Sequence, residues 1–100
     1  MAALQELLSR LVEHDDLTAA ETAAVMDDIL TDSASPVAMG AFLAALRVKR
    51  ETPAEVEGLA AAMLAHALRF EVPGRTVDIV GTGGDGFSTV NISTMGSIVI

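Results

Sequence analysis

The sequence has 100 residues, no cysteine and a formal net charge of −8, and it is 51% hydrophobic with only 3% aromatic residues. The lack of cysteine excludes disulfides and thiolate metal sites, and six basic residues are too few to line a nucleic-acid groove or a polybasic membrane surface. No apolar run approaches the ~20 residues of a membrane span, and the acidic N-terminal segment does not look like a signal peptide. We therefore expect a cytoplasmic protein that binds neither nucleic acid nor membrane.

Two helices are predicted first along the chain. Leucines recur at helical spacing from Ala2 to Glu13, and His14-Asp15-Asp16 then breaks the pattern. The next helix begins with Thr18-Ala19-Ala20-Glu21, a capping box in which the Thr18 hydroxyl and the Glu21 carboxylate satisfy free backbone amides. Its apolar stripe is expected to end at Asp32-Ser33 and to consist of Val25, Met26, Ile29 and Leu30.

Two further helices begin with proline at the first helical position. Ser35-Pro36 opens a helix that is expected to run to about Lys49, where basic residues suit the negative end of the helix dipole. Thr52-Pro53-Ala54-Glu55 combines a cap, a proline and a capping box, and Val72-Pro73-Gly74 is expected to stop the helix that follows. The apolar stripe of this last helix is predicted to comprise Val56, Leu59, Ala60, Met63, Leu64 and Ala67.

These four amphipathic helices, joined by short polar turns, predict a small helical bundle. The expected fold class is mostly α: a helical domain over residues 1–72, followed at 73–100 by the first strand and glycine-rich loop of a truncated α/β domain. The histidines His14 and His66 are expected in a loop and on a helix, and the acids at Asp15, Asp16, Asp27 and Asp28 are expected on solvated faces.

The character of the sequence changes after the helices. Val77 to Val80 is a short β-prone run, and it leads into the glycine-rich segment Gly81-Thr82-Gly83-Gly84-Asp85-Gly86. Glycine lets an anion approach the backbone, and successive amides can form a nest for phosphate. Asn91, Ser93 and Thr94 supply side-chain donors at a predicted helix start, where free amides also favour phosphate.

This pattern predicts a site for a phosphorylated ligand, with the carboxylate of Asp85 suited to a magnesium ion or a ligand hydroxyl. It is neither the Walker nor the Rossmann pattern, and glycines between a strand and a helix also occur as a purely structural connection.

The segment from Val77 to Thr94, with DIVGTGGDG followed by NIST, resembles the anthranilate phosphoribosyltransferases. The preceding helices, including the Thr-Pro-Ala-Glu start, are similar to the N-terminal helical segment of that family. The resemblance implies transfer of the phosphoribosyl group from phosphoribosyl diphosphate to the nitrogen of anthranilate, with release of diphosphate, on the way to tryptophan.

The resemblance also implies residue roles. Gly81 would contact both substrates, and Ser93 would in addition bind magnesium. The positions implied to hold phosphoribosyl diphosphate are Gly81, Gly84, Asp85, Thr89, Asn91, Ile92, Ser93 and Thr94. No general base is visible, so no catalytic residue is assigned within this sequence.

Other parts of the family's site have no counterpart in these residues, so we expect the sequence to be the N-terminal portion of a longer enzyme and to be inactive alone. The family also implies a homodimer formed through the helical domain, which would bury parts of the first and third predicted helices. Two alternatives stay open: a helical interaction module without catalysis, and a relative of the pyrimidine nucleoside phosphorylases.

Overall fold

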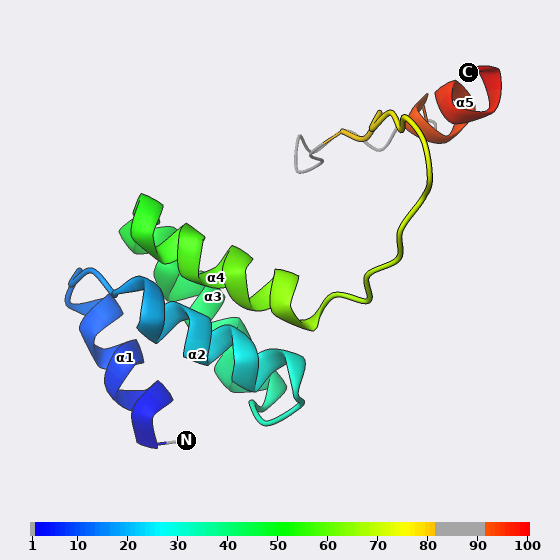
Figure 1. Cartoon of the computed structure of the whole chain (residues 1–100). Helices are drawn as coiled ribbons and strands as arrows, with labels where there is room; N and C mark the ends of the chain where they lie inside the picture. The colour runs from blue at the N-terminus through cyan, green and yellow to red at the C-terminus, as the bar shows by residue number, and fades with distance from the viewer. Residues whose placement is uncertain (1, 82–91) are drawn as a thin grey trace. The chain divides into compact units, whose positions relative to one another are not determined.

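The computed structural model describes residues 2–81 and 92–100. These residues fall into two compact units, Met1–Leu68 and Arg69–Ile100, and each unit is described by itself. The first unit holds α1 (Ala2–Val12), α2 (Ala19–Leu30), α3 (Pro36–Lys49) and α4 (Pro53–His66), and the second holds α5 (Ile92–Val99). The predicted four-helix bundle is therefore confirmed (Figure 1).

The helix starts follow the predicted capping chemistry. Thr18 and Thr52 each form a complete capping box, with Glu21 and Glu55 respectively. Ser35 accepts a hydrogen bond from the amide of Ala38 and precedes a proline at the first position of α3. Each cap satisfies amides that lack an intrahelical partner, so local sequence alone sets these three boundaries.

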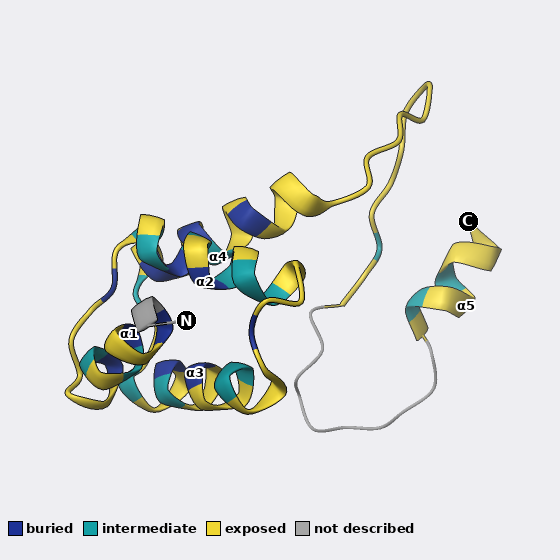
Figure 2. Ribbon diagram, turned by 90° about the horizontal axis from the view of Figure 1, so that it is seen from below, coloured by how far each residue is buried: buried dark blue, intermediate teal, exposed yellow. Residues whose placement is uncertain are grey.

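The core of the bundle lies between two helix pairs, with α2 packed along α4 and α1 against α3. Figure 2 shows the buried residues on the sides of these helices that face one another. The buried apolar cluster comprises Leu4, Leu7, Leu11, Leu17, Val25, Ala34, Phe42 and Leu46. Burying such side chains contributes about 1.5–3 kcal/mol for each large residue, which is the main force holding the helices together.

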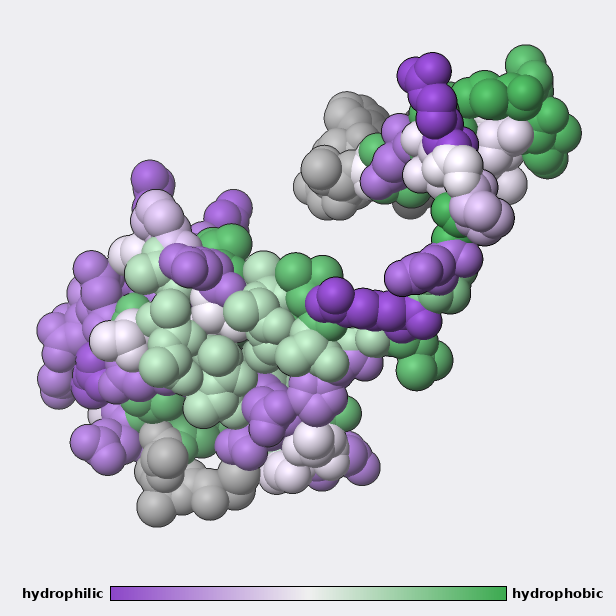
Figure 3. Space-filling view, viewed as in Figure 1, coloured by the Kyte–Doolittle hydropathy of each residue, from purple (hydrophilic) through white to green (hydrophobic). Residues whose placement is uncertain are grey.

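The predicted apolar stripe of α4 is wrong except at Leu59, which is half-buried and packs against the core, while its other members are exposed. The buried residues of this helix are Glu55, Gly58 and Ala62, whereas Met63 and Leu64 are more than half exposed. The small residues are turned inward because α2 approaches α4 closely, and the larger apolar side chains therefore lie outside. Figure 3 shows apolar residues gathered on the face of the bundle where α2 and α4 lie.

The end of α4 also differs from the prediction. The helix ends at His66 rather than near Val72-Pro73-Gly74, and Ala67 has an extended backbone. From Ala67 to Asp78 every residue is exposed, so no packing stabilises further helical turns. No helix of the described residues is long and apolar enough to cross a membrane.

The run from Val77 to Val80 forms no strand in the described part of the chain. A strand needs a neighbour that pairs with its amides and carbonyls, and none of the described residues provides one. The amide of Val80 instead donates to the side chain of Asp78 at 3.2 Å. The predicted strand is therefore absent here, although the helical part of the fold class is confirmed.

Candidate functional site

The described part of the predicted phosphate site consists of Gly81 and the first turn of α5. Ile92, Ser93 and Thr94 open this helix, and no acidic residue lies in its first turn. The first amides of a helix have no intrahelical acceptor, and the helix dipole adds partial positive charge there. The turn thus offers amides and two hydroxyls, a set of donors suited to an anion such as phosphate.

Residues on both sides of the glycine-rich segment lie together in this unit. A Cβ built on Gly96 of α5 would lie 3.7 Å from the Cδ1 atom of Ile79, so the helix and the preceding run are in contact. Val77, Ile79, Ser97 and Ile100 line a small hollow between them. Ile79 and Gly96 are half-buried, which anchors α5 beside the residues that lead into Gly81.

The hydroxyls of α5 differ in their bonding. Ser97 donates to the carbonyl oxygen of Ser93 at 2.9 Å, so its hydroxyl is used within the helix. Ser93 is half-buried and Thr94 is exposed. The first-turn hydroxyls are thus the ones placed to reach a ligand at the helix start.

Gly81 is exposed, and a Cβ added there would meet nothing within 4 Å. Among the described glycines only Gly74 has a positive φ, 94°. At Gly81, therefore, neither a positive φ nor lack of room for a Cβ requires glycine. Four of the predicted ligand residues, Gly84, Asp85, Thr89 and Asn91, lie outside the described residues.

Within the described ranges 2–81 and 92–100, no group of three or more His, Cys, Asp or Glu side chains is arranged to hold a metal ion. Ser93 contributes one hydroxyl oxygen, a type of ligand that magnesium accepts. A magnesium ion at this turn would therefore need most of its ligands from phosphate oxygens, water or other residues.

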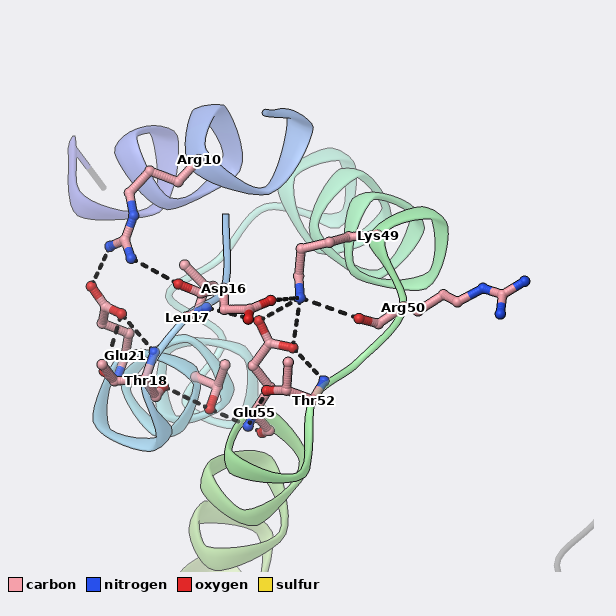
Figure 4. Close-up of polar contacts among 10 residues, drawn as sticks. Arg10, Asp16, Leu17, Thr18, Glu21, Lys49, Arg50, Thr52 and Glu55 are labelled. Atoms are coloured by element: carbon pink, nitrogen blue, oxygen red, sulfur yellow. Dashed lines mark hydrogen bonds and ion pairs between the residues drawn. The ribbon is translucent and has the colours of Figure 1, made fainter. Parts of the chain in front are cut away.

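The bundle contains a buried ion pair that the sequence did not predict (Figure 4). The Glu55 carboxylate is fully buried and lies 3.0 Å from Nζ of Lys49, whose side chain is only 3% exposed. The amides of Leu17 and Thr52 donate to the same carboxylate at 2.8 and 2.7 Å. One side chain thus joins the start of α4 to the α1–α2 connection and to the end of α3.

The ammonium group of Lys49 also has several hydrogen-bond acceptors around it. It donates to Oδ1 of Asp16 at 2.8 Å and to the carbonyl oxygen of Arg50 at 3.2 Å, besides Glu55. Burial by itself lowers the pKa of Lys49, but the bonds to Asp16 and Glu55 outweigh this and raise the pKa. Burial likewise raises the pKa of Glu55, but the bonds from Leu17, Thr52 and Lys49 lower it overall.

Two further acids, Asp16 and Asp27, lie on solvated faces as predicted, with side chains 69% and 60% exposed, and each also takes part in an ion pair. Asp16 pairs with Lys49, and Asp27 of α2 pairs with His66 at the end of α4. A third pair joins Arg10 to Glu21, and Arg10 also donates to the carbonyl oxygen of Asp16 at 3.0 Å. His14 lies in the loop after α1 with φ of 66°, and His66 ends a helix, as predicted for both.

Sequence reasoning found Glu55 only as a capping residue. The signal it missed is the spacing of Glu55, Gly58 and Ala62, which places small residues and the carboxylate on one face of α4. A glycine three residues after a capping glutamate indicates a close helix contact at that end of the helix.

Residues 5–67 match the helical bundle domain of a glycosyl transferase family, and residues 73–100 match an a/b domain described for a glycosyl transferase family. The chain is 55% identical over 94 residues to an anthranilate phosphoribosyltransferase of Saccharopolyspora erythraea, and 57% identical over 94 residues to one of Streptomyces griseus. Each alignment covers 94% of this chain and 27% of the relative. A third such protein, from Methylocella silvestris, is 46% identical over all 100 residues, which are 29% of its length. The chain thus spans between a quarter and a third of the length of these relatives.

Proposed function

Because the chain belongs to the glycosyl transferase family whose helical bundle domain matches residues 5–67, we propose that it is the N-terminal part of an anthranilate phosphoribosyltransferase. The complete enzyme would move the phosphoribosyl group from phosphoribosyl diphosphate to anthranilate, as a cytoplasmic step of tryptophan biosynthesis. The proposal rests chiefly on the 55–57% identity to two such enzymes across 94% of the chain. In this reading residues 1–72 form the helical domain and residues 73–100 begin the substrate-binding domain.

The first turn of α5 supports a phosphate-binding role. Ile92, Ser93 and Thr94 present amides and hydroxyls at the positive end of the helix, with no acidic residue in that turn to repel an anion. These donors would hold the diphosphate group and stabilise the charge that grows on it as it leaves. The predicted roles of Gly81, Gly84, Asp85, Thr89 and Asn91 belong to the same proposal.

We propose that Ser93 also places its hydroxyl oxygen on magnesium. When bound, magnesium would supply positive charge that neutralises the leaving diphosphate. The described residues offer this oxygen without a cluster of carboxylates, so phosphate oxygens of the ligand, water or other residues would supply the remaining ligands. We expect the 100-residue chain alone to be inactive, since it spans only about 27% of the relatives.

A chimera tests the proposed activity. The chain replaces the matching N-terminal segment of the Saccharopolyspora erythraea relative, and consumption of anthranilate is followed in the presence of phosphoribosyl diphosphate and magnesium. The account predicts activity in the chimera and none in the 100-residue chain. A folded chimera without activity, beside an active unmodified relative, would count against the proposal.

We also propose a homodimer in which α1 and α3 meet the same helices of a second copy. Leu11 and Val12 of α1 line a hollow with Ala44, Ala45 and Val48 of α3, and His14 also lines it. Val12 and Val48 are 71% and 75% exposed. A second copy would remove this apolar surface from water, and a two-fold axis would place the same patch on both sides.

A further inference from the structure

We infer that Lys49 and Glu55 form a latch between the α1–α2 and α3–α4 connections, and that loss of the negative charge on Glu55 opens this end of the bundle while the rest of the core stays packed. The latch is not part of the proposed transferase reaction and does not depend on it. It rests on the arrangement of hydrogen bonds around one buried carboxylate (Figure 4).

The first step is that Glu55 alone holds the amide of Leu17. Leu17 precedes the cap of α2 and therefore has no intrahelical acceptor for its amide, which donates to Glu55 at 2.8 Å instead. Leu17 is itself a core residue, only 3% exposed. Release of this amide would thus loosen a core side chain next to the α1–α2 connection.

The second step is that every group facing the carboxylate is a donor. Lys49 approaches from the end of α3, and the amides of Leu17 and Thr52 approach from the two connections. A protonated or amide side chain at position 55 would have to present hydrogens of its own toward some of these donors. At least one of these hydrogen bonds to position 55 would then be lost. The donor that lost its partner would stay buried without a hydrogen bond.

The third step is that, besides Glu55, one further ion pair among the described residues links the two connections, the pair between Lys49 and Asp16. Arg10 pairs with Glu21 and donates to the carbonyl of Asp16, so it joins α1 to α2 and their own loop. Asp16, which is 69% exposed, is the remaining charged group on Lys49. Opening the latch would therefore leave the α1–α2 connection intact, with only the exposed Asp16–Lys49 pair still joining it to the α3–α4 connection.

The apolar packing of α3 and the contact of α2 with α4 do not use the carboxylate. Phe42 and Leu46 are buried among apolar side chains. Thr22 of α2 donates to the backbone carbonyl of Glu55 at 3.0 Å, a contact that the protonation of the side chain leaves in place. These contacts give the physical basis for a local opening rather than global unfolding.

The chain offers a direct probe, because Lys49 is its only lysine. The rate at which an amine-reactive reagent labels Lys49 at pH 7 is compared in the parent, Glu55→Gln, Asp16→Asn and the control Glu57→Gln, whose residue is exposed on the same helix. Hydrogen exchange of the Leu17 amide is compared with that of Phe42 and Leu46 in each protein.

We expect Glu55→Gln to accelerate both Lys49 labelling and Leu17 exchange at least about tenfold, the factor that follows from losing one hydrogen bond to a charged group. Phe42 and Leu46 should exchange as in the parent, and Glu57→Gln should change nothing. Asp16→Asn should accelerate labelling alone. Unchanged Lys49 labelling and Leu17 exchange in folded Glu55→Gln would overturn the inference. Equal acceleration of Lys49 labelling and of amide exchange at Leu17, Phe42 and Leu46 would also overturn it.

If Glu55→Gln does not fold, the parent supplies the test. Its amide exchange is measured from pH 6 downward and corrected for the intrinsic effect of pH. The latch predicts that Leu17 loses protection before Phe42 does. Simultaneous loss at both residues would contradict it.

Discussion

Gly58 of α4 lies directly against the backbone of Ala19 in α2. A Cβ built on Gly58 would lie 2.0 Å from the carbonyl oxygen of Ala19 and 2.2 Å from the hydroxyl oxygen of Thr22. Both neighbours are held in place, the first by the helix backbone and the second by its bond to the carbonyl of Glu55. The close contact of α2 with α4 therefore requires glycine at position 58.

Replacing Gly58 by alanine should destabilise the bundle strongly. The added methyl group must push the backbones of α2 and α4 apart, at a cost of about 3 kcal/mol or more. Urea denaturation followed by circular dichroism measures the effect. The matched control is Gly40→Ala in α3, where an added Cβ meets nothing within 4 Å. That control should stabilise the protein by about 0.5–1 kcal/mol, and a similar gain at position 58 would refute the close contact.

The stability of the bundle should fall in acid because of Glu55. Its pKa is lower in the folded chain than the ordinary value of 4.5, so its stabilising contribution is present above pH 4.5 and is lost as the pH falls through the folded pKa. Urea unfolding of the parent and of Glu55→Gln between pH 3 and about 7 should therefore show a shallower acid decline in the variant. Glu57→Gln should retain the parental decline, and parallel curves for all three proteins would contradict the assignment.

Arg50 holds a backbone conformation that glycine adopts more easily. Its φ is 74° and its ψ is 125° as the chain leaves α3. Arg50→Gly should therefore raise the free energy of unfolding by about 0.5–1 kcal/mol, and its carbonyl remains available to Lys49. Arg47→Gly, inside the last turn of α3, should instead lower the free energy of unfolding by about 0.5–1 kcal/mol. Thermal unfolding distinguishes the two, and a loss of stability in Arg50→Gly would show that the arginine side chain matters more than its backbone.

The proposed dimer predicts that a charge on the α1–α3 surface separates the two copies. Val48→Asp introduces a carboxylate on a residue that is 75% exposed, so the fold of the monomer should tolerate it. Sedimentation should show a dimer for the parent and a monomer for the variant. Val56→Asp, on an exposed apolar residue of α4, is the matched control and should remain dimeric. A monomeric parent at high concentration would contradict the dimer itself.

Local signals in the sequence predicted the helix starts well. The caps at Thr18, Ser35 and Thr52 depend on residues within three positions, so they are visible without knowledge of the fold. The breaks after α1 and α2 were also predicted, and both coincide with positive φ at His14 and Asp32.

The faces and the end of α4 could not be read in the same way. Glu55 is buried because of Leu17 and Lys49, and Leu17 is 38 positions away along the chain. Periodicity ranked Met63 and Leu64 as core residues, whereas the close contact at Gly58 selects small side chains for that face. The strand from Val77 to Val80 needs partners that the described residues do not contain, and the roles of Gly84, Asp85, Thr89 and Asn91 stay predictions.

The most direct test of the proposed site is the binding of phosphoribosyl diphosphate to the chimera, measured by calorimetry at several magnesium concentrations. Ser93→Ala removes a hydroxyl from the first turn of α5, and Ser97→Ala removes one that is bonded within the helix. Losing a hydrogen bond to a charged group costs about 1.5–3 kcal/mol, so Ser93→Ala should weaken binding by about tenfold or more. The loss should be largest where binding depends on magnesium, and Ser97→Ala should bind like the parent. Equal affinity in the parent and in folded Ser93→Ala would contradict the account of this turn as the phosphate site.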